Sequence, residues 1–300
     1  MVGSVNRYRI AGHLIEVKDT PLTEIMDLLP SFSPFSIIQE KEGEIPLVTL
    51  SCTRGKITPE GSVLEEFSRN SCHYKIFSHN EAITCQIRRN QIIHHMQLVM
   101  GHSDVQCDLD TTQDSPTDIT QKEKAPFLSN FLSIALALAS VKHNTIKVHA
   151  SAIEKEGKAL LFLGKSGTGK STHASLWLKH ITGSTLINDD EPLVRLHEDG
   201  TVRVYGSPWS GKTPCYQNIS AQVEAFVLLS QNKQNRLIKL SGVKAFGALF
   251  SSVAILRSKR EHHDALFEQV ATLSVMKPVY LLECRPDREA VLLSHSLLQP

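Results

Sequence analysis

The sequence lacks the long apolar segments and the excess of one charge that mark several classes of protein. No stretch of about 18 uninterrupted apolar residues occurs, so no transmembrane helix is predicted. The nearest candidate, Phe127 to Val141, is interrupted by serines and an asparagine and predicts a buried amphipathic helix. Lys and Arg number 32 against 31 Asp and Glu, a formal charge of +1, which argues against nucleic-acid and membrane-surface partners.

Paired cysteines and a signal peptide are also missing. The first residues have no apolar core of the kind that secretory signals carry. Six cysteines are widely scattered and none belongs to a Cys-x-x-Cys pair, which is typical of reduced thiols in a cytoplasmic protein. The cysteines are Cys52, Cys72, Cys85, Cys107, Cys215 and Cys284.

The length of 300 residues predicts about two domains. Residues 103–124 are polar and rich in Asp, Thr and Gln, as in a linker or an exposed loop. The expected fold class is α/β, with a smaller mainly-β N-terminal domain over residues 1–110 and a second domain over 125–300. The first domain could bind a substrate or a partner.

Apolar and alternating runs predict the individual elements. In the first domain they indicate strands over 7–17, 46–50, 74–77, 82–87 and 92–99, and a helix over 23–29. In the second they indicate helices over 127–143, 169–181, 241–256 and 261–273, and strands over 148–154, 158–164, 184–188, 224–230 and 278–284. Asp199-Gly200 predicts a hairpin between 193–197 and 201–205, and a last helix is expected after Pro286. This interleaving favours an α/β domain.

Residues 164–171 read GKSGTGKS and fit the phosphate-binding pattern G-x-x-x-x-G-K-[ST]. Glycines let the backbone curl so that successive N–H groups point at a phosphate, and the following helix adds its positive end. In this chemistry Lys170 reaches the β- and γ-phosphates, and the Ser171 hydroxyl ligates Mg²⁺. The residues expected to hold the nucleotide are Gly164, Ser166, Gly167, Thr168, Gly169, Lys170, Ser171 and Thr172.

A second segment, residues 206–213 (GSPWSGKT), fits the same pattern. Pro214 follows directly, which disfavours a helical start, and Pro208 with Trp209 stiffens and crowds the loop. This segment is therefore expected to be a substrate-facing or structural loop. Trp209 could contact the substrate there, and Lys212 could touch a phosphate.

Asp189 and Asp190 come 19 residues after Lys170, at the end of a predicted strand. One carboxylate could hold Mg²⁺ while the other accepts a proton from an attacking hydroxyl. The alternative is a solvated turn, and the phosphate-binding pattern upstream favours the metal and acid–base interpretation. His149 precedes a strand, where it could steer a carboxylate or a phosphate or be merely structural. The adjacent pairs His94-His95 and His262-His263 are poor metal pairs by geometry.

These residues together resemble a family. His-Ala-Ser at 149–151, the strand pair, GKSGTGKS and the Asp-Asp pair are similar to the catalytic domain of bacterial HPr kinase/phosphorylases and the nucleotide core of phosphoenolpyruvate carboxykinases. The resemblance covers roughly residues 145–300, with specific motifs in 149–190. It implies a P-loop catalytic domain in which Asp189 is the catalytic base, Asp190 binds Mg²⁺ with Ser171, and Lys170 and His149 also take part.

The resemblance further implies an ATP- and Mg²⁺-dependent kinase that phosphorylates a hydroxyl, such as a serine of a protein or peptide or free serine. The arginine-rich segment that HPr kinases use in the reverse reaction is missing, and the N-terminal part does not resemble their regulatory domain. We therefore expect a stand-alone relative, with a homo-oligomer as one option. A carboxykinase-like small-molecule phosphotransferase and a non-catalytic nucleotide sensor are the alternatives.

Overall fold

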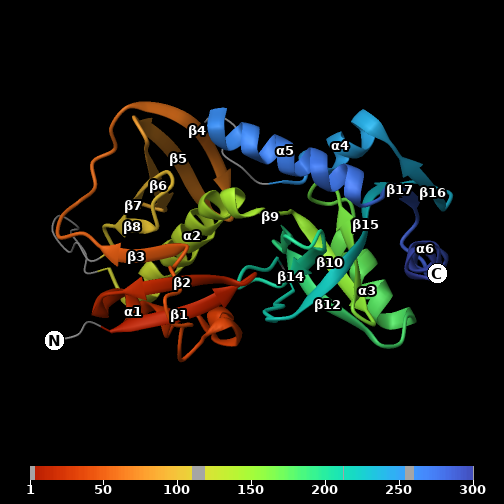
Figure 1. The fold of residues 1–300 in the computed structure, drawn as a ribbon, viewed down its shortest axis with the longest axis horizontal. Coiled ribbons are helices and arrows are strands. Elements are labelled where there is room, and N and C mark those ends of the chain that lie inside the picture. The colour runs from red at the N-terminus through yellow and green to blue at the C-terminus, as the bar shows by residue number, and fades with distance from the viewer. Residues whose placement is uncertain (1–3, 110–118, 212, 254–259, 300) are drawn as a thin grey trace. The chain divides into compact units, whose positions relative to one another are not determined.

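Two β-sheets, each with its own helices, make up this mixed α/β protein. The computed structural model describes residues 4–109, 119–211, 213–253 and 260–299, and the chain is drawn in Figure 1. Contacts divide it into two compact units, residues 1–140 with 255–263 and residues 141–254 with 264–300. The sequence prediction began its second domain at residue 125, whereas the second unit begins at 141.

The first unit is built on an eight-stranded sheet with the order β1-β2-β3-β8-β7-β6-β5-β4. Strands β2, β3 and β8 run parallel, and the path from β8 through β7, β6 and β5 to β4 is an antiparallel meander. The strands are β1 (Val5–Ile10), β2 (His13–Lys18), β3 (Val48–Cys52), β4 (Ser62–Arg69), β5 (Cys72–His79), β6 (Ala82–Arg89), β7 (Ile92–Val99) and β8 (Asp104–Cys107).

Asparagines at a ten-residue spacing make the turns of this meander. Asn70, Asn80 and Asn90 have φ angles of 50°, 53° and 56°, and each connects two consecutive antiparallel strands. Two-residue hairpin turns need positive φ, which asparagine tolerates better than most residues. The predicted single strand over 7–17 is likewise a hairpin, because Ala11 and Gly12 both adopt positive φ between β1 and β2.

Helix α2 (Gln121–Ser140) belongs to the first unit and packs with α1 (Thr20–Met26), β3 and β7. It begins six residues before the predicted start, because Thr120 and Glu123 form a reciprocal capping box ahead of Pro126. By length and composition, residues 121–143 could cross a membrane. However, 67% of the most apolar window is buried inside the structure, as in a core helix.

The predicted linker over 103–124 is correct only in part. Residues 104–107 form β8, which pairs with β3 and β7, and α2 starts at residue 121. Residues 110–118 lie outside the described part of the chain. A strand whose partner is about fifty residues away is not visible in local composition, which explains the difference.

The second unit is built on a nine-stranded sheet with the order β12-β10-β11-β15-β14-β13-β9, and β17 joins β15 to β16. Strands β11, β15 and β17 run parallel, while β10 is antiparallel to both β11 and β12. Its strands are β9 (Thr145–Lys147), β10 (Ala150–Lys155), β11 (Lys158–Leu163), β12 (Ser184–Asp190), β13 (Leu193–Leu196), β14 (Val202–Tyr205), β15 (Ser220–Gln231), β16 (Arg236–Leu240) and β17 (Val279–Cys284).

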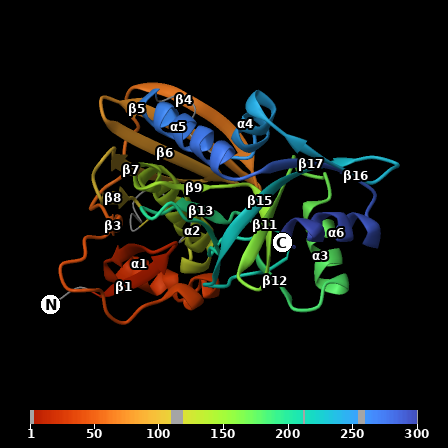
Figure 2. The same ribbon diagram turned by 45° about the vertical axis from the view of Figure 1, so that its right-hand side comes forward.

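Helices α3 (Lys170–His180) and α6 (Arg288–His295) lie side by side in this unit (Figure 2). Trp177 of α3 is fully buried in a core cluster that includes Phe162 and Val227, and its indole N–H donates to Ser294 Oγ of α6 at 2.8 Å. The expected helix after Pro286 is thereby confirmed as α6. The Asp199-Gly200 hairpin is also confirmed, by the antiparallel pairing of β13 with β14.

Helices α4 (Gly242–Phe250) and α5 (Arg260–Met276) correspond to the two remaining predicted helices. Residues 254–256 of the first prediction lie outside the described residues. The predicted strand 184–188 continues to Asp190, so both aspartates lie in β12 rather than in a solvated turn.

Truncation of Trp177 tests this packing. We expect Trp177→Ala to lower the free energy of unfolding by about 3–5 kcal/mol, because it removes a buried ring and leaves Ser294 without its indole donor. Leu178→Ala, at a neighbouring side chain that is 45% exposed, should change it by less than about 0.5 kcal/mol. Chemical denaturation of both variants measures the difference, and equal losses would contradict the assigned helix face.

Candidate functional site

The sheet of the second unit brings the predicted site residues to one edge. Because β10 is antiparallel to both β11 and β12, the latter two run in the same direction and their carboxyl ends share an edge. Segment 164–169 follows β11, Asp189 and Asp190 end β12, and His149 directly precedes β10. Three segments that lie apart in the sequence therefore meet where β11 and β12 end.

Segment 164–169 is a curled loop held open by glycines. Gly164, Gly167 and Gly169 have φ angles of 143°, 85° and 102°, values that side-chain-bearing residues rarely adopt. Gly169 is the N-cap of α3 and offers no capping side chain, so the first turn of the helix presents its backbone N–H groups to an anion. Within the loop, Thr168 donates from its N–H and its hydroxyl to the Lys165 carbonyl, at 3.2 and 2.9 Å.

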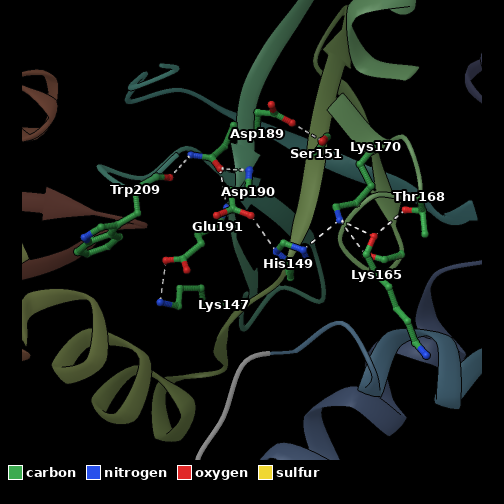
Figure 3. Close-up of polar contacts among 12 residues, drawn as sticks. Lys147, His149, Ser151, Lys165, Thr168, Lys170, Asp189, Asp190, Glu191 and Trp209 are labelled. Atoms are coloured by element: carbon green, nitrogen blue, oxygen red, sulfur yellow. Dashed lines mark hydrogen bonds and ion pairs between the residues drawn. The ribbon is translucent and has the colours of Figure 1, made fainter. Parts of the chain in front are cut away.

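The Lys170 side chain folds back beneath this loop (Figure 3). Its ammonium donates to the Gly164 carbonyl at 2.8 Å and contacts the Lys165 carbonyl at 3.4 Å. Lys170 is only 8% exposed, whereas Lys165 in the same loop is exposed and its side chain points away. Ser166, Ser171 and Thr172 are also exposed. The structure thus buries the Lys170 side chain and exposes the Lys165 side chain.

His149 links Lys170 to Asp190. The Lys170 ammonium lies 3.0 Å from His149 Nε2, and His149 Nδ1 lies 2.9 Å from Asp190 Oδ1. An ammonium group can only donate, so Nε2 must accept and the ring proton must sit on Nδ1, where it points to the carboxylate. The result is a continuous lysine–histidine–aspartate chain, and both the histidine and the aspartate side chains are partly exposed.

Asp189 faces the opposite way from Asp190, as neighbours in a strand do. It is 3% exposed and its carboxylate accepts a hydrogen bond from the buried Ser151 hydroxyl on β10. Burial raises the pKa of the nearby Cys215 thiol to about 11, and the Asp189 charge adds to the rise. This thiol is therefore protonated at neutral pH and unsuited to nucleophilic chemistry.

The buried side chain of Asn188 joins the acidic pair to segment 206–213. Its Oδ1 accepts from the N–H groups of Asp190 and Glu191, at 3.1 and 2.8 Å. Its Nδ2 donates to the Trp209 carbonyl at 2.8 Å and to Ser207 Oγ at 3.2 Å. One amide thus holds the end of β12 and the neighbouring loop in a fixed relation.

Residues 206–211 of this segment lie directly against the acidic pair. Gly211 donates its N–H to the Asp189 carbonyl at 2.8 Å, and a Cβ at Gly211 would come within 2.6 Å of that oxygen. Trp209 is 8% exposed and packs near Lys147, which is paired with Glu191 at 2.8 Å. No helix follows in residues 213–219, and Lys212 lies outside the described residues.

The donors around this edge fit Mg²⁺ better than a transition metal. No cluster of three or more His, Cys, Asp or Glu side chains occurs among the described residues. Mg²⁺ is usually bound by one or two carboxylates together with substrate phosphates and waters, so it needs no such cluster. Asp190 and Ser171 supply oxygen donors of this kind, and Ser171 is exposed on the first turn of α3.

Two residues of this arrangement were not predicted from the sequence. Ser151 and Asn188 each make their contacts across strands, and neither belongs to a motif with a fixed spacing. The only signal for Ser151 is its place two residues after His149 in the His-Ala-Ser sequence. For Asn188 the only signal is its place immediately before the acidic pair.

The comparisons with known proteins identify a family and include a likeness to a solved structure. Residues 105–286 match the family model described as SynChlorMet cassette protein ScmC. The HPr(Ser) kinase/phosphatase from Coxiella burnetii is similar over 51% of this chain and 88% of that one, at 13% identity and a TM-score of 0.32. A likeness this weak supports no argument on fold or function.

No curated protein matches the sequence. The family model, in contrast, covers more than half of the chain, including the glycine loop, both aspartates and segment 206–213. The protein therefore belongs to the family of the SynChlorMet cassette protein ScmC.

Proposed function

We propose that this protein is an ATP- and Mg²⁺-dependent kinase that transfers a phosphoryl group to a hydroxyl, that of a serine in a protein or peptide or of free serine. One observation carries the proposal: the Lys170 ammonium lies under a glycine-rich loop and contacts His149, which in turn contacts Asp190. A phosphate-binding cation and an acid–base pair are thereby adjacent. Phosphoryl transfer needs both, and most of its catalysis is positioning and electrostatics.

In this proposal the loop and Lys170 hold the terminal phosphates of ATP. Backbone N–H groups of the loop and of the first turn of α3 point at the phosphate oxygens. The Lys170 ammonium exchanges its contact with His149 for one with the transferring phosphoryl group, where its charge offsets the negative charge of the transition state. Mg²⁺, held by Asp190 and Ser171, would supply further positive charge to the phosphates when bound.

The exchange leaves His149 Nε2 ready to accept a proton. The acceptor oxygen attacks the γ-phosphorus, the bond from that phosphorus to the ADP oxygen breaks, and the acceptor proton passes to Nε2. Asp190 keeps the ring in the required tautomer through Nδ1 and stabilises the imidazolium that forms. The resemblance to HPr kinases instead implies Asp189 as the base. Its 3% exposure and its hydrogen bond to Ser151 favour a supporting role.

The remaining parts of the proposal concern the surroundings of the site. Ser210, which forms a β-bridge with Asp190, and Gly211 would form one wall of the acceptor site. The first unit would select the acceptor. A homo-oligomer would be compatible with this role. We place the protein in the cytoplasm, where ATP is abundant; all six cysteines are free thiols in the structure.

Acceptor trials test the proposed function. We expect incubation with radiolabelled ATP and Mg²⁺ to label a serine peptide or free serine, and the label to survive as phosphoserine in mass spectrometry. Labelling of a carboxylate or enolate metabolite instead would favour a carboxykinase-like phosphotransferase. Tight ATP binding without transfer or hydrolysis would contradict the kinase and favour a nucleotide sensor.

Lys170, the first residue of α3, and Lys165 of the preceding loop provide a matched pair. Lys170→Ala should weaken ATP binding at least 100-fold, because the variant loses the buried ammonium that faces the phosphates. Lys165→Ala removes the same charge from an exposed position and should change the affinity less than threefold. Isothermal titration calorimetry with Mg²⁺-ATP measures both, and similar losses would mean that net charge rather than position matters.

Substitutions at the acidic pair and at His149 distinguish the two assignments of the base. His149→Gln and Asp190→Asn should each lower turnover at least 100-fold, as loss of general base catalysis does. Asp189→Asn should lower turnover less than tenfold, and its main effect should be a lower melting temperature, since it weakens a buried hydrogen bond. Turnover that is lost in Asp189→Asn and kept in His149→Gln would reverse the roles. Circular dichroism confirms that each variant folds.

A further inference from the structure

A cavity of about 550 Å³ opens beside the glycine loop and lies wholly within the second unit. One wall is formed by Gly167, Thr168, Gly169 and the first turn of α3. The other walls come from the carboxyl ends of β15 and β17, which share the edge with β11, and from the residues that follow these strands. Lys170, His149 and Asp190 are absent from its lining. The cavity therefore adjoins the loop without being part of the chemical centre.

The cavity is fastened to the loop by a direct contact. Gln231, the last residue of β15, donates from Nε2 to the Gly167 carbonyl at 3.2 Å. The volume of the cavity falls within the 300–1,000 Å³ typical of sites for small organic ligands, and the cavity is much larger than a phosphate group needs. A ligand with its phosphates in the loop could therefore extend directly into this space.

The walls combine apolar surface with polar groups and positive charge. Leu229 and Pro286 supply apolar surface, and Gln231 and Asn232 supply amides that can both donate and accept hydrogen bonds. Arg285 also lines the cavity; its guanidinium is paired with Asp287 at 3.0 Å, and its planar face can stack on an aromatic ring. This mixture suits a flat heteroaromatic base that is joined to an anionic chain.

The lining of the cavity also includes a histidine that stays neutral. His173 is 3% exposed, its ring packs edge-on against Phe162 at 4.6 Å, and burial lowers its pKa to about 4. Its Nε2 is engaged with Ser294 Oγ at 3.1 Å. At neutral pH this residue adds no charge to the cavity, so it presents an uncharged surface to a ligand.

We infer that this cavity holds the nucleoside half of the phosphoryl donor, so that the donor is a nucleoside triphosphate rather than an inorganic polyphosphate. The inference rests on the proposed function, since it takes the loop to bind the phosphates. It adds a site at Leu229, Gln231, Asn232, Arg285 and Pro286 that no phosphate-loop pattern contains. In this inference the nucleobase lies between these residues and the first turn of α3.

Comparison of ATP with inorganic tripolyphosphate tests the inference on the full-length protein. Both ligands offer a triphosphate, and only ATP carries a nucleoside. With Mg²⁺ present, we expect calorimetry to show ATP bound at least tenfold more tightly. Pro286→Trp and Lys233→Trp each place a bulky ring at an exposed position of the lining. They should bring ATP to within threefold of tripolyphosphate and leave tripolyphosphate binding within threefold of the wild type. Val243→Trp, at an 86% exposed residue outside the lining, is the control and should change neither affinity.

Each outcome separates this inference from the proposed function. Equal affinities of the wild type for ATP and tripolyphosphate would overturn the nucleoside site and leave the phosphate loop intact. A preference for ATP that both tryptophan variants retain would place the nucleoside elsewhere and would also overturn it. Failure of both ligands to bind would contradict the proposed function itself. Melting curves of the three variants establish that they are folded before binding is measured.

Discussion

The contact of the Lys170 ammonium with the Gly164 carbonyl is the interaction on which the rest of the site depends. It draws a cation under the loop, and the same cation fixes the ring of His149 through Nε2. The ring in turn meets Asp190 through Nδ1. Removal of water from Lys170 strengthens each of these contacts, because charge interactions are screened less in a buried setting. The loop, the imidazole and the carboxylate therefore form one electrostatic unit.

The buried amide of Asn188 has a comparable role on the other side of β12. It satisfies backbone N–H groups of the acidic end and also binds the segment around Trp209. Buried polar groups that are fully paired fix a unique arrangement, since any displacement leaves a donor or an acceptor without a partner. The two aspartates can then point to opposite faces of β12 while their backbone stays in one place.

Local patterns were sufficient to predict the elements that carry their own signal. The apolar run of β11, the glycines after it and the 3–4 spacing of α3 predicted that helix to within a residue, and Asp199-Gly200 predicted its hairpin. The ten-residue spacing of Asn70, Asn80 and Asn90 was also readable, and would have given β4 and the meander. In contrast, the pairing of β8 with β3 depends on distant residues, as does the contact of Ser151 with Asp189. The direction in which each aspartate points likewise follows from the strand order, which composition does not encode.

The close contact between Gly211 and the Asp189 carbonyl restricts which residues the loop around Gly211 can contain. A methyl group at Gly211 would come within 2.6 Å of the Asp189 carbonyl oxygen, and one at Gly206 within 1.9 Å of the Gln217 carbonyl oxygen. Neither glycine has a positive φ, so crowding by a backbone oxygen, rather than backbone conformation, excludes a side chain at these positions. The backbone around Gly206 and Gly211 is therefore held close to its neighbours, and a larger side chain at either position would displace it.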